Sequence, residues 1–318
     1  MRKDHDGTGV PGAEPSSARP APDGSAKFLT GDLMRHVAVM SLSASVGLVS
    51  VFLVDFVDLY FIALIGDPAL TAAVGFAGAL VFFNISATIG LMIAVGALAA
   101  RRIGAGDTLG ARRAATNVLA LGVAIGAVLG VTLAVAATPL LAAMGAQGEA
   151  LAAGTQYLQI VAPSLPIMVV GMAASGLLRA HGDARRAMTV TLTAGAVNAV
   201  LDPLFIFVLD LGLNGAALAS VCARIAMALS ALAPVYRHYG GLAPWNAAAF
   251  RADLPAILGI AGPAVLTNLA TPAGAILVTR FMAAYGDDAV AGFAVISRLT
   301  PLVFCVIFAL SGAVGPIV

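Results

Sequence analysis

Residues 42–66 read LSASVGLVSVFLVDFVDLYFIALIG, a run of mostly apolar side chains that two carboxylates interrupt. A helix needs about 20 such residues to cross the hydrocarbon core of a bilayer, so this stretch predicts a membrane-spanning helix. The carboxylates, Asp55 and Asp58, are three residues apart and project from nearly the same helix face. Ionisable groups inside membrane segments are costly unless they face a partner or water. The stretch therefore indicates an ion or proton site in a transporter.

The composition of the whole chain supports an all-α integral membrane protein. Of its 318 residues, 60% are hydrophobic and only 10% are charged, whereas soluble domains carry about 25% charged residues. The net charge of +1 gives no reason to expect a nucleic-acid partner. The chain contains no P-loop, no His-Glu-x-x-His and no serine nucleophile elbow. We therefore expect neither an enzyme nor a cofactor, and no metal site apart from one for a coupling Na⁺.

Eight apolar runs are long enough to cross a membrane. They occupy residues 36–65, 69–99, 115–141, 154–178, 187–209, 213–236, 254–283 and 289–317. The short alternating segments of a membrane β-barrel do not occur. The first 33 residues are rich in Pro, Gly, Ser and charge, which is typical of a disordered tail.

The basic residues predict the orientation of these spans. Fourteen of the seventeen Lys and Arg residues fall in the N-terminal tail or in alternate junctions between runs. The positive-inside rule places these junctions and the N-terminus in the cytoplasm. Abundant Ala, Gly and Arg with few Lys are typical of GC-rich bacterial genomes. We therefore expect a multi-pass protein of the bacterial plasma (inner) membrane.

An internal repeat predicts how the spans are grouped. The Gly-Asp pair at 66–67 lies between the first two runs, and a similar segment surrounds the pair at 286–287, an offset of 220 residues. Six spans intervene, so the two copies run in the same direction, as in parallel repeats related by an axis along the membrane normal. We expect a six-helix N-terminal lobe at 34–240 and the first two helices of a second lobe at 241–318.

A second polar group occurs in the fifth run, MTVTLTAGAVNAVLDPLFIFVL. Asn198 and Asp202 are four residues apart and share a helix face. Their oxygens suit a small cation, or the amide can hydrogen-bond a carboxyl that titrates. Pro203 should kink the helix, because it has no N–H to donate. The alternatives are polar packing between helices for the Asn-Asp pair and, for Asp58, a position near the outer headgroups.

Further polar residues are candidates of second rank. Ser220 in the sixth run and Ser175 in the fourth could complete a polar pocket, although small hydroxyl residues are also usual in helix packing. Arg224 could pair with a cavity carboxylate or extend to the membrane surface. Asp55 could be a partner of Asp58 or a structural hydrogen-bond acceptor.

Four segments resemble one family of transporters. They are DLYFIALIGDPALTAAVG, GLLRAHGDARRAM, NAVLDPLFIFVL and GDDAVAGFAVISRLTPLVF. These segments resemble the multidrug and toxic compound extrusion (MATE) transporters, nearer their DinF-like branch. The resemblance implies two six-helix lobes around a central cavity in a monomeric protein. It also implies export of organic cations or amphipathic drugs in exchange for Na⁺ or H⁺. The family has twelve helices, so with eight the chain is expected to be C-terminally incomplete.

The resemblance also implies which residues bind the coupling cation. The family's N-lobe site corresponds to Asp58, Asn198, Asp202 and Ser220 in this sequence. One alternative is a lipid-linked oligosaccharide flippase of the same superfamily, which predicts a more basic cavity. Another is a Mg²⁺-dependent membrane prenyltransferase, because Asp55-x-x-Asp58 resembles its Asp-rich motif. Against the enzyme, Asp202 has no second acid within one turn.

Overall fold

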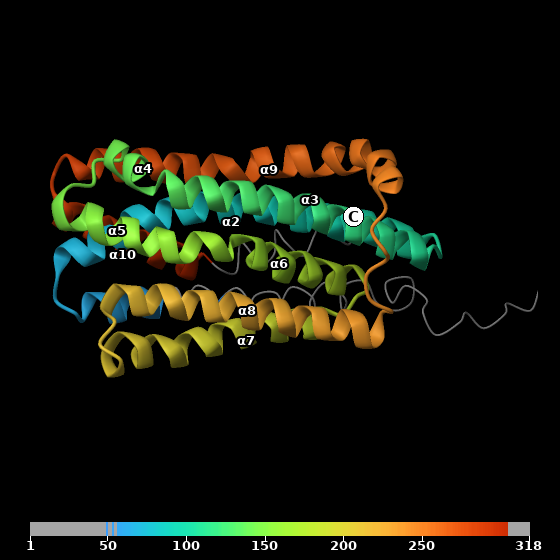
Figure 1. Cartoon of the computed structure of the whole chain (residues 1–318), viewed down its shortest axis with the longest axis horizontal. Coiled ribbons are helices and arrows are strands. Elements are labelled where there is room, and N and C mark those ends of the chain that lie inside the picture. Colours follow the sequence, from blue (N-terminus) through green and yellow to red (C-terminus); the bar gives the residue numbers. More distant parts are fainter. Residues whose placement is uncertain (1–48, 50–52, 54–55, 305–318) are drawn as a thin grey trace, which may run out of the picture.

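The structure, a computed structural model, describes residues 49, 53 and 56–304, and the ordered elements among them are helices (Figure 1). The end of the first predicted span is helical over residues 56–63. The following elements are α2 (Pro68–Gly104), α3 (Thr108–Val135), α4 (Ala137–Ala143), α5 (Gly148–Val161), the 3₁₀ turn η1 (Ala162–Ser164), α6 (Leu165–Ala180), α7 (Ala184–Pro203), the π-helical segment η2 (Leu204–Val208), α8 (Gly212–His238), α9 (Ala247–Ala283) and α10 (Asp287–Val303). The predicted all-α class is confirmed.

Six helical stretches in the described part of the chain are long and apolar enough to cross a membrane. One of them joins α5, η1 and α6, and another joins α7 and η2. Several predictions fall outside the described residues. They concern most of the first span, the end of the eighth span, the tail at 1–33 and the candidate Asp55. The helices found support the prediction of a multi-pass membrane protein.

Several predicted span boundaries differ from the structure, among them the end of the second span, which continues to Gly104, and the start of the third, which lies at Thr108. The predicted third span is divided, because α3 ends at Val135 and the short helix α4 follows. The fourth span begins six residues earlier than predicted, at Gly148. A 3₁₀ turn around Pro163 separates its two α-helices, α5 and α6. The seventh begins at Ala247, where the side chain of Asn246 accepts hydrogen bonds from the N–H groups of Ala248 and Ala249.

The same Gly-Asp pair begins three of the helices. Each glycine has a positive φ, and each aspartate accepts a hydrogen bond from a backbone N–H of the first helical turn. The pairs are Gly66-Asp67 before α2, Gly106-Asp107 before α3 and Gly182-Asp183 before α7. Gly286 before α10 also has a positive φ, of 94°, so the two ends of the predicted repeat have similar backbone geometry. Glycine adopts this conformation without steric cost.

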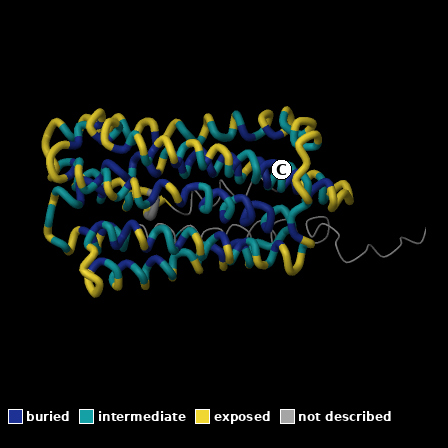
Figure 2. Tube along the Cα trace, in the orientation of Figure 1, coloured by how far each residue is buried: buried dark blue, intermediate teal, exposed yellow. Residues whose placement is uncertain are grey.

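Helix α2 is the centre of the bundle. It packs against α3, α5, α6, α9 and α10. Of its most apolar stretch 56% is buried, against 67% for the stretch that joins α5 and α6 and 11% for α9, and Figure 2 colours the whole bundle by burial. Helix α9 packs along α2 at a very short distance. A Cβ added to Gly90 would lie 2.6 Å from the backbone nitrogen of Val265. In Figure 1, α3 and α9 lie along one edge and α7 and α8 along the opposite edge.

Candidate cation site

Asn198 connects two carboxylates that are distant in the sequence. Its Nδ2 donates one hydrogen bond to Oδ1 of Asp58, over 3.1 Å, and another to Oδ2 of Asp202. Asn198 and Asp202 project from the same face of α7, and only 7% and 1% of their surfaces are exposed. The structure therefore brings together three of the four residues predicted for the cation site.

The two carboxyl groups have unequal surroundings. Oδ1 of Asp202 is buried and has no hydrogen-bond partner among the described residues. Buried polar oxygens are rarely left in this state. The carboxyl groups of Asp58 and Asp202 are close together, because both accept from the same nitrogen of Asn198. Two like charges so close disfavour double ionisation unless a proton or a cation is present. The arrangement is therefore chemically suited to taking up a proton or a small cation.

Tyr157 on α5 links Ser220 to this cluster. Its phenol group lies close enough to Ser220 on α8 and to Asp58 to interact with both. Sequence reasoning had included Ser220 but missed Tyr157. One signal was present, because Tyr157 is the single tyrosine in the span from Gly148 to Ala180.

Two arginines add positive charge beside the tyrosine. Both Arg224 and Arg298 interact electrostatically with Tyr157. Arg224 on α8 donates from Nη1 to the Val161 carbonyl over 3.1 Å and to Ser164 Oγ over 2.7 Å. The guanidinium of Arg298 on α10 lies against α2. Both guanidinium groups therefore lie near Tyr157, on which Asp58 also acts.

The comparison with known proteins identifies the family. A model of the MatE family matches residues 44–204, about half of the chain. The chain belongs to the MATE family. This assignment confirms the resemblance that the sequence segments indicated. It also agrees with the expectation that the chain is not an enzyme, because the structural relatives are transporters. The placement near the DinF-like branch stays a prediction.

Matches to two curated transporters cover nearly the whole chain. The FAD transporter of Shewanella oneidensis is 28% identical over 297 residues, which are 92% of this chain and 66% of the relative. The multidrug export protein MepA of Staphylococcus aureus is 25% identical over 296 residues, which are 92% of this chain and 65% of MepA. The chain thus spans just under two thirds of the length of these relatives.

Solved transporter structures share the fold. An outward-facing multidrug resistance MATE transporter aligns with a TM-score of 0.81 and 27% identity, over 94% of this chain and 67% of that one. An inward-facing structure gives a TM-score of 0.72 and 26% identity, over 88% and 64%. A transporter from Pyrococcus furiosus, described as having a binding pocket of reverse polarity, gives 0.80 and 27% identity, over 94% and 67%.

The predicted helix disturbance at Pro203 has a definite form in this MATE protein. The α-helix ends at Pro203, one residue after Asp202, and continues as the π-helical segment η2. The wider turn is closed by a hydrogen bond of 2.9 Å from the N–H of Leu209 to the carbonyl of Leu204. Single π-helical turns inside helices are frequent at functional sites.

Ser175 is not joined to the cluster in the described part of the structure. It is buried on α6, 4% exposed, and its hydroxyl group has no hydrogen-bond partner among the described residues. Small hydroxyl residues are common where membrane helices pack closely. The geometry thus agrees with the packing interpretation of Ser175.

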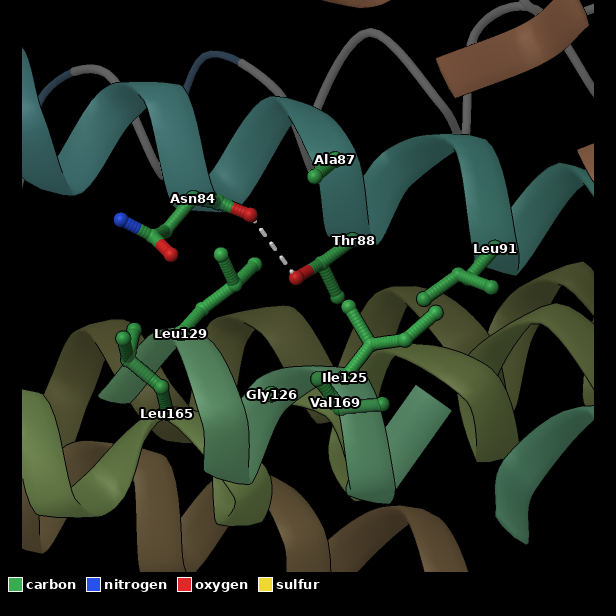
Figure 3. Close-up of a pocket in the computed structure, with 9 residues that line it drawn as sticks. All are labelled: Asn84, Ala87, Thr88, Leu91, Ile125, Gly126, Leu129, Leu165 and Val169. Carbon is green, nitrogen blue, oxygen red and sulfur yellow. Dashed lines mark hydrogen bonds between the residues drawn. The ribbon is translucent and has the colours of Figure 1, made fainter. Parts of the chain in front are cut away.

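A small cavity lies between α2, α3 and α6 of the MATE fold (Figure 3). Its polar lining comes from Asn84 and Thr88, whose hydroxyl group donates to the Asn84 carbonyl over 2.9 Å. Asn84 Oδ1 has no described partner. The cavity volume of about 10 Å³ is enough for one water molecule but for no drug. It is therefore unsuitable as a substrate site.

Proposed function

We propose that this chain forms the cation-binding lobe of an antiporter that exports organic cations or amphipathic drugs in exchange for Na⁺ or H⁺. The observation that carries the proposal is the Asn198 amide, which holds Asp58 and Asp202 together inside the bundle. The relative MepA, named a multidrug export protein, supports this class of substrate. The basic junctions support a cytoplasmic N-terminus in a plasma membrane.

The coupling follows from charge. With both carboxylates ionised and no cation bound, their repulsion acts across the contact between the first helix and α7. A bound proton or Na⁺ removes this repulsion and favours a different arrangement of the helices. A ligand shifts such an equilibrium by its difference in affinity for the two states. The existence of outward-facing and inward-facing structures in the family supports two such states.

Cation binding is the first test, because it does not depend on transport. The purified chain is titrated with ²²Na⁺ at several pH values, and proton release on Na⁺ addition is recorded. We expect Asp202→Asn to weaken binding at least about tenfold. The matched control is Asp210→Asn, since Asp210 is an exposed acid at a positive φ of 52°, which asparagine tolerates. Equal binding by wild type and Asp202→Asn contradicts the proposed site.

Transport is the second test. Proteoliposomes are given a Na⁺ or an H⁺ gradient separately, and the movement of a fluorescent organic cation is followed. Gradient-driven transport by wild type that Asp202→Asn abolishes supports antiport. Transport of a lipid-linked oligosaccharide instead of the dye would favour the flippase alternative.

A second candidate is export of an anionic compound. Arg224 and Arg298 both interact with Tyr157, beside the acids, and one relative is named an FAD transporter. Guanidinium groups bind phosphate in a bidentate manner. Once the acids are neutralised, the two arginines leave an excess of positive charge. Binding of FAD by wild type that Arg298→Gln weakens, with binding of the organic cation unchanged, favours this candidate.

A further inference from the structure

The carboxylate of Asp253 on α9 contacts side chains of two helices that lie much earlier in the sequence. Asp253 accepts two hydrogen bonds from Arg113 on α3, from Nε over 2.9 Å and from Nη2 over 3.0 Å. Asn117, one turn further along α3, donates to Asp253 Oδ2 over 2.8 Å. Arg102, near the end of α2, lies 3.8 Å from Oδ1. A single side chain of α9 is therefore held by both α2 and α3.

The surroundings make this contact stronger than an ordinary surface ion pair. The Asp253 side chain is 14% exposed, and Asn117 is 1% exposed. Exposed ion pairs contribute little to stability, but bidentate bonds between guanidinium and carboxylate are roughly twice as strong as neutral hydrogen bonds. Loss of the carboxylate would also leave the buried amide of Asn117 without its acceptor, which is costly.

The segment before α9 is anchored by separate contacts. Arg112 donates to the Gly241 carbonyl over 3.0 Å, and Thr116 donates to the Ala243 carbonyl over 3.0 Å. The Tyr239 hydroxyl group donates to Asp183 over 2.7 Å. None of these bonds involves Asp253, so the connection between α8 and α9 stays fixed if the Asp253 contact opens.

Helix α9 can bend just after this contact. Pro255 lies inside α9, two residues after Asp253, and has no N–H for the helix. Sharp bends in helices occur mainly at prolines. The short segment 247–254 is therefore held at one end by the anchored connection, and its other end adjoins a weak point of the helix.

We infer that Asp253 is a latch that holds α9 against α2 and α3 and keeps the arginine-rich end of the bundle closed. Opening of that end requires release of Asp253 from Arg113, Asn117 and Arg102. The role of the latch in transport rests on the proposed function, because it assumes alternating access. The existence of the latch does not depend on that function. The higher TM-score with an outward-facing relative than with an inward-facing one agrees with a closed cytoplasmic end.

The latch is tested by the distance between α3 and α9. Spin labels are attached at Leu109→Cys on α3 and at Leu258→Cys, which lies just beyond Pro255 on α9. Both positions are exposed, and Cys222 and Cys305 are replaced by serine. Distances are measured by pulsed electron resonance on the whole chain in nanodiscs. We expect Asp253→Asn to raise the ratio of long to short distances about fivefold or more. The control Asp288→Asn, in the first turn of α10, should leave the ratio unchanged.

Exchange of the two charges separates the latch from general destabilisation. Arg113→Asp alone should open the end, and the double variant Arg113→Asp/Asp253→Arg should restore most of the short distances. Arg113→Lys keeps the charge but loses the bidentate geometry, so it should give an intermediate ratio. Unchanged distances in Asp253→Asn, or no recovery in the double variant, overturn the inference.

The same variants show whether the latch and the cation site fail separately. ²²Na⁺ binding by Asp253→Asn should stay within about twofold of wild type, which is a negligible change in binding free energy. If wild type binds no cation while the distances still respond to Asp253→Asn, the proposed function fails and the latch stands. If cation binding depends on Asp202 and the distances do not respond, the latch fails alone.

Discussion

Asn198 and Asp58 are 140 residues apart in the chain, yet the amide of one donates to the carboxylate of the other over 3.1 Å. The same nitrogen also donates to Asp202. An amide nitrogen carries two hydrogens, so both are committed to carboxylates. The orientation of the amide is thereby determined, because the reverse orientation would place its oxygen against two acids. The two carboxylates are coupled through this one group.

The shared donor predicts non-additive effects on cation binding. Asp58→Asn and Asp202→Asn should each weaken ²²Na⁺ or proton uptake about tenfold or more. The double variant should be little worse than the poorer single variant, because residues that share a partner are coupled by about 0.5–3 kcal/mol. Binding isotherms of the three variants and of Asp210→Asn provide the measurement. Fully additive losses would show that the two acids act independently.

The close approach of α2 and α9 predicts a large effect of one methyl group. In Gly90→Ala the new Cβ would meet the backbone of Val265 at 2.6 Å, so the helices must move apart. We expect a loss of about 1–3 kcal/mol of stability, seen as a lower midpoint of thermal unfolding in detergent. At Gly259 on α9, no described atom lies within 4 Å of an added Cβ. Gly259→Ala should therefore be neutral or stabilising, by up to about 1 kcal/mol.

Two buried serines should respond differently to the same substitution. Ser164 Oγ accepts from Arg224 and donates to the Val161 carbonyl, so Ser164→Ala should cost about 1–3 kcal/mol. Ser175 has no described hydrogen-bond partner, so Ser175→Ala should change stability by less than about 0.5 kcal/mol or increase it. Thermal unfolding of both variants, followed with a thiol-reactive dye, gives the comparison. A marked loss in Ser175→Ala would point to a polar role for this hydroxyl group.

The His181 ring predicts a dependence of stability on pH. Burial lowers the pKa of His181 below its ordinary value of 6.5, against the opposing effects of the Leu177 carbonyl and Asp183. The folded state thus favours the neutral ring, which lies against the tilted ring of Tyr239 with 4.1 Å between ring centroids. This contribution is present above pH 6.5 and is lost as the pH falls through the lower, folded-state pKa.

The measurement for His181 compares how much the unfolding midpoint changes with pH in two proteins, and not the midpoints themselves. The unfolding midpoint of wild type should fall more between pH 7.5 and pH 5.5 than that of His181→Gln. The neighbouring Asp183 does not interfere in this range. Its partial burial opposes ionisation, but hydrogen bonds from Tyr239 and Arg186 outweigh this effect and lower its pKa from 3.8. Parallel curves for the two proteins would contradict the prediction.

The sequence was sufficient for features that depend on local spacing. Asn198 and Asp202 are one helical turn apart, so their shared face follows from helix geometry alone. The disturbance at Pro203 follows from its missing N–H. The meeting of this pair with Asp58 required the family resemblance, because no local rule relates residues 140 positions apart.

Other features depend on packing and could not be derived from spacing. Tyr157 was missed because its hydroxyl group gains a role only where α5 meets α8. Asp253 lies just before the predicted seventh span, and the contact with Arg113 joins residues 140 positions apart. The start of α9 was misplaced because the charged Arg251 and Asp253 interrupt its first turns, and a hydropathy criterion therefore begins the span only after them.

The Gly-Asp junctions have a consequence for the order in which the helices form during synthesis. Each aspartate bonds to an N–H group only two or three residues further along the chain. These bonds need no contact with any other span, so α2, α3 and α7 can each acquire a defined first turn as it leaves the ribosome. Spans that enter the bilayer one after another then already have fixed ends when the bundle assembles. The cap at Asp183 fixes where α7 begins, and with it the place of Asn198 along that helix.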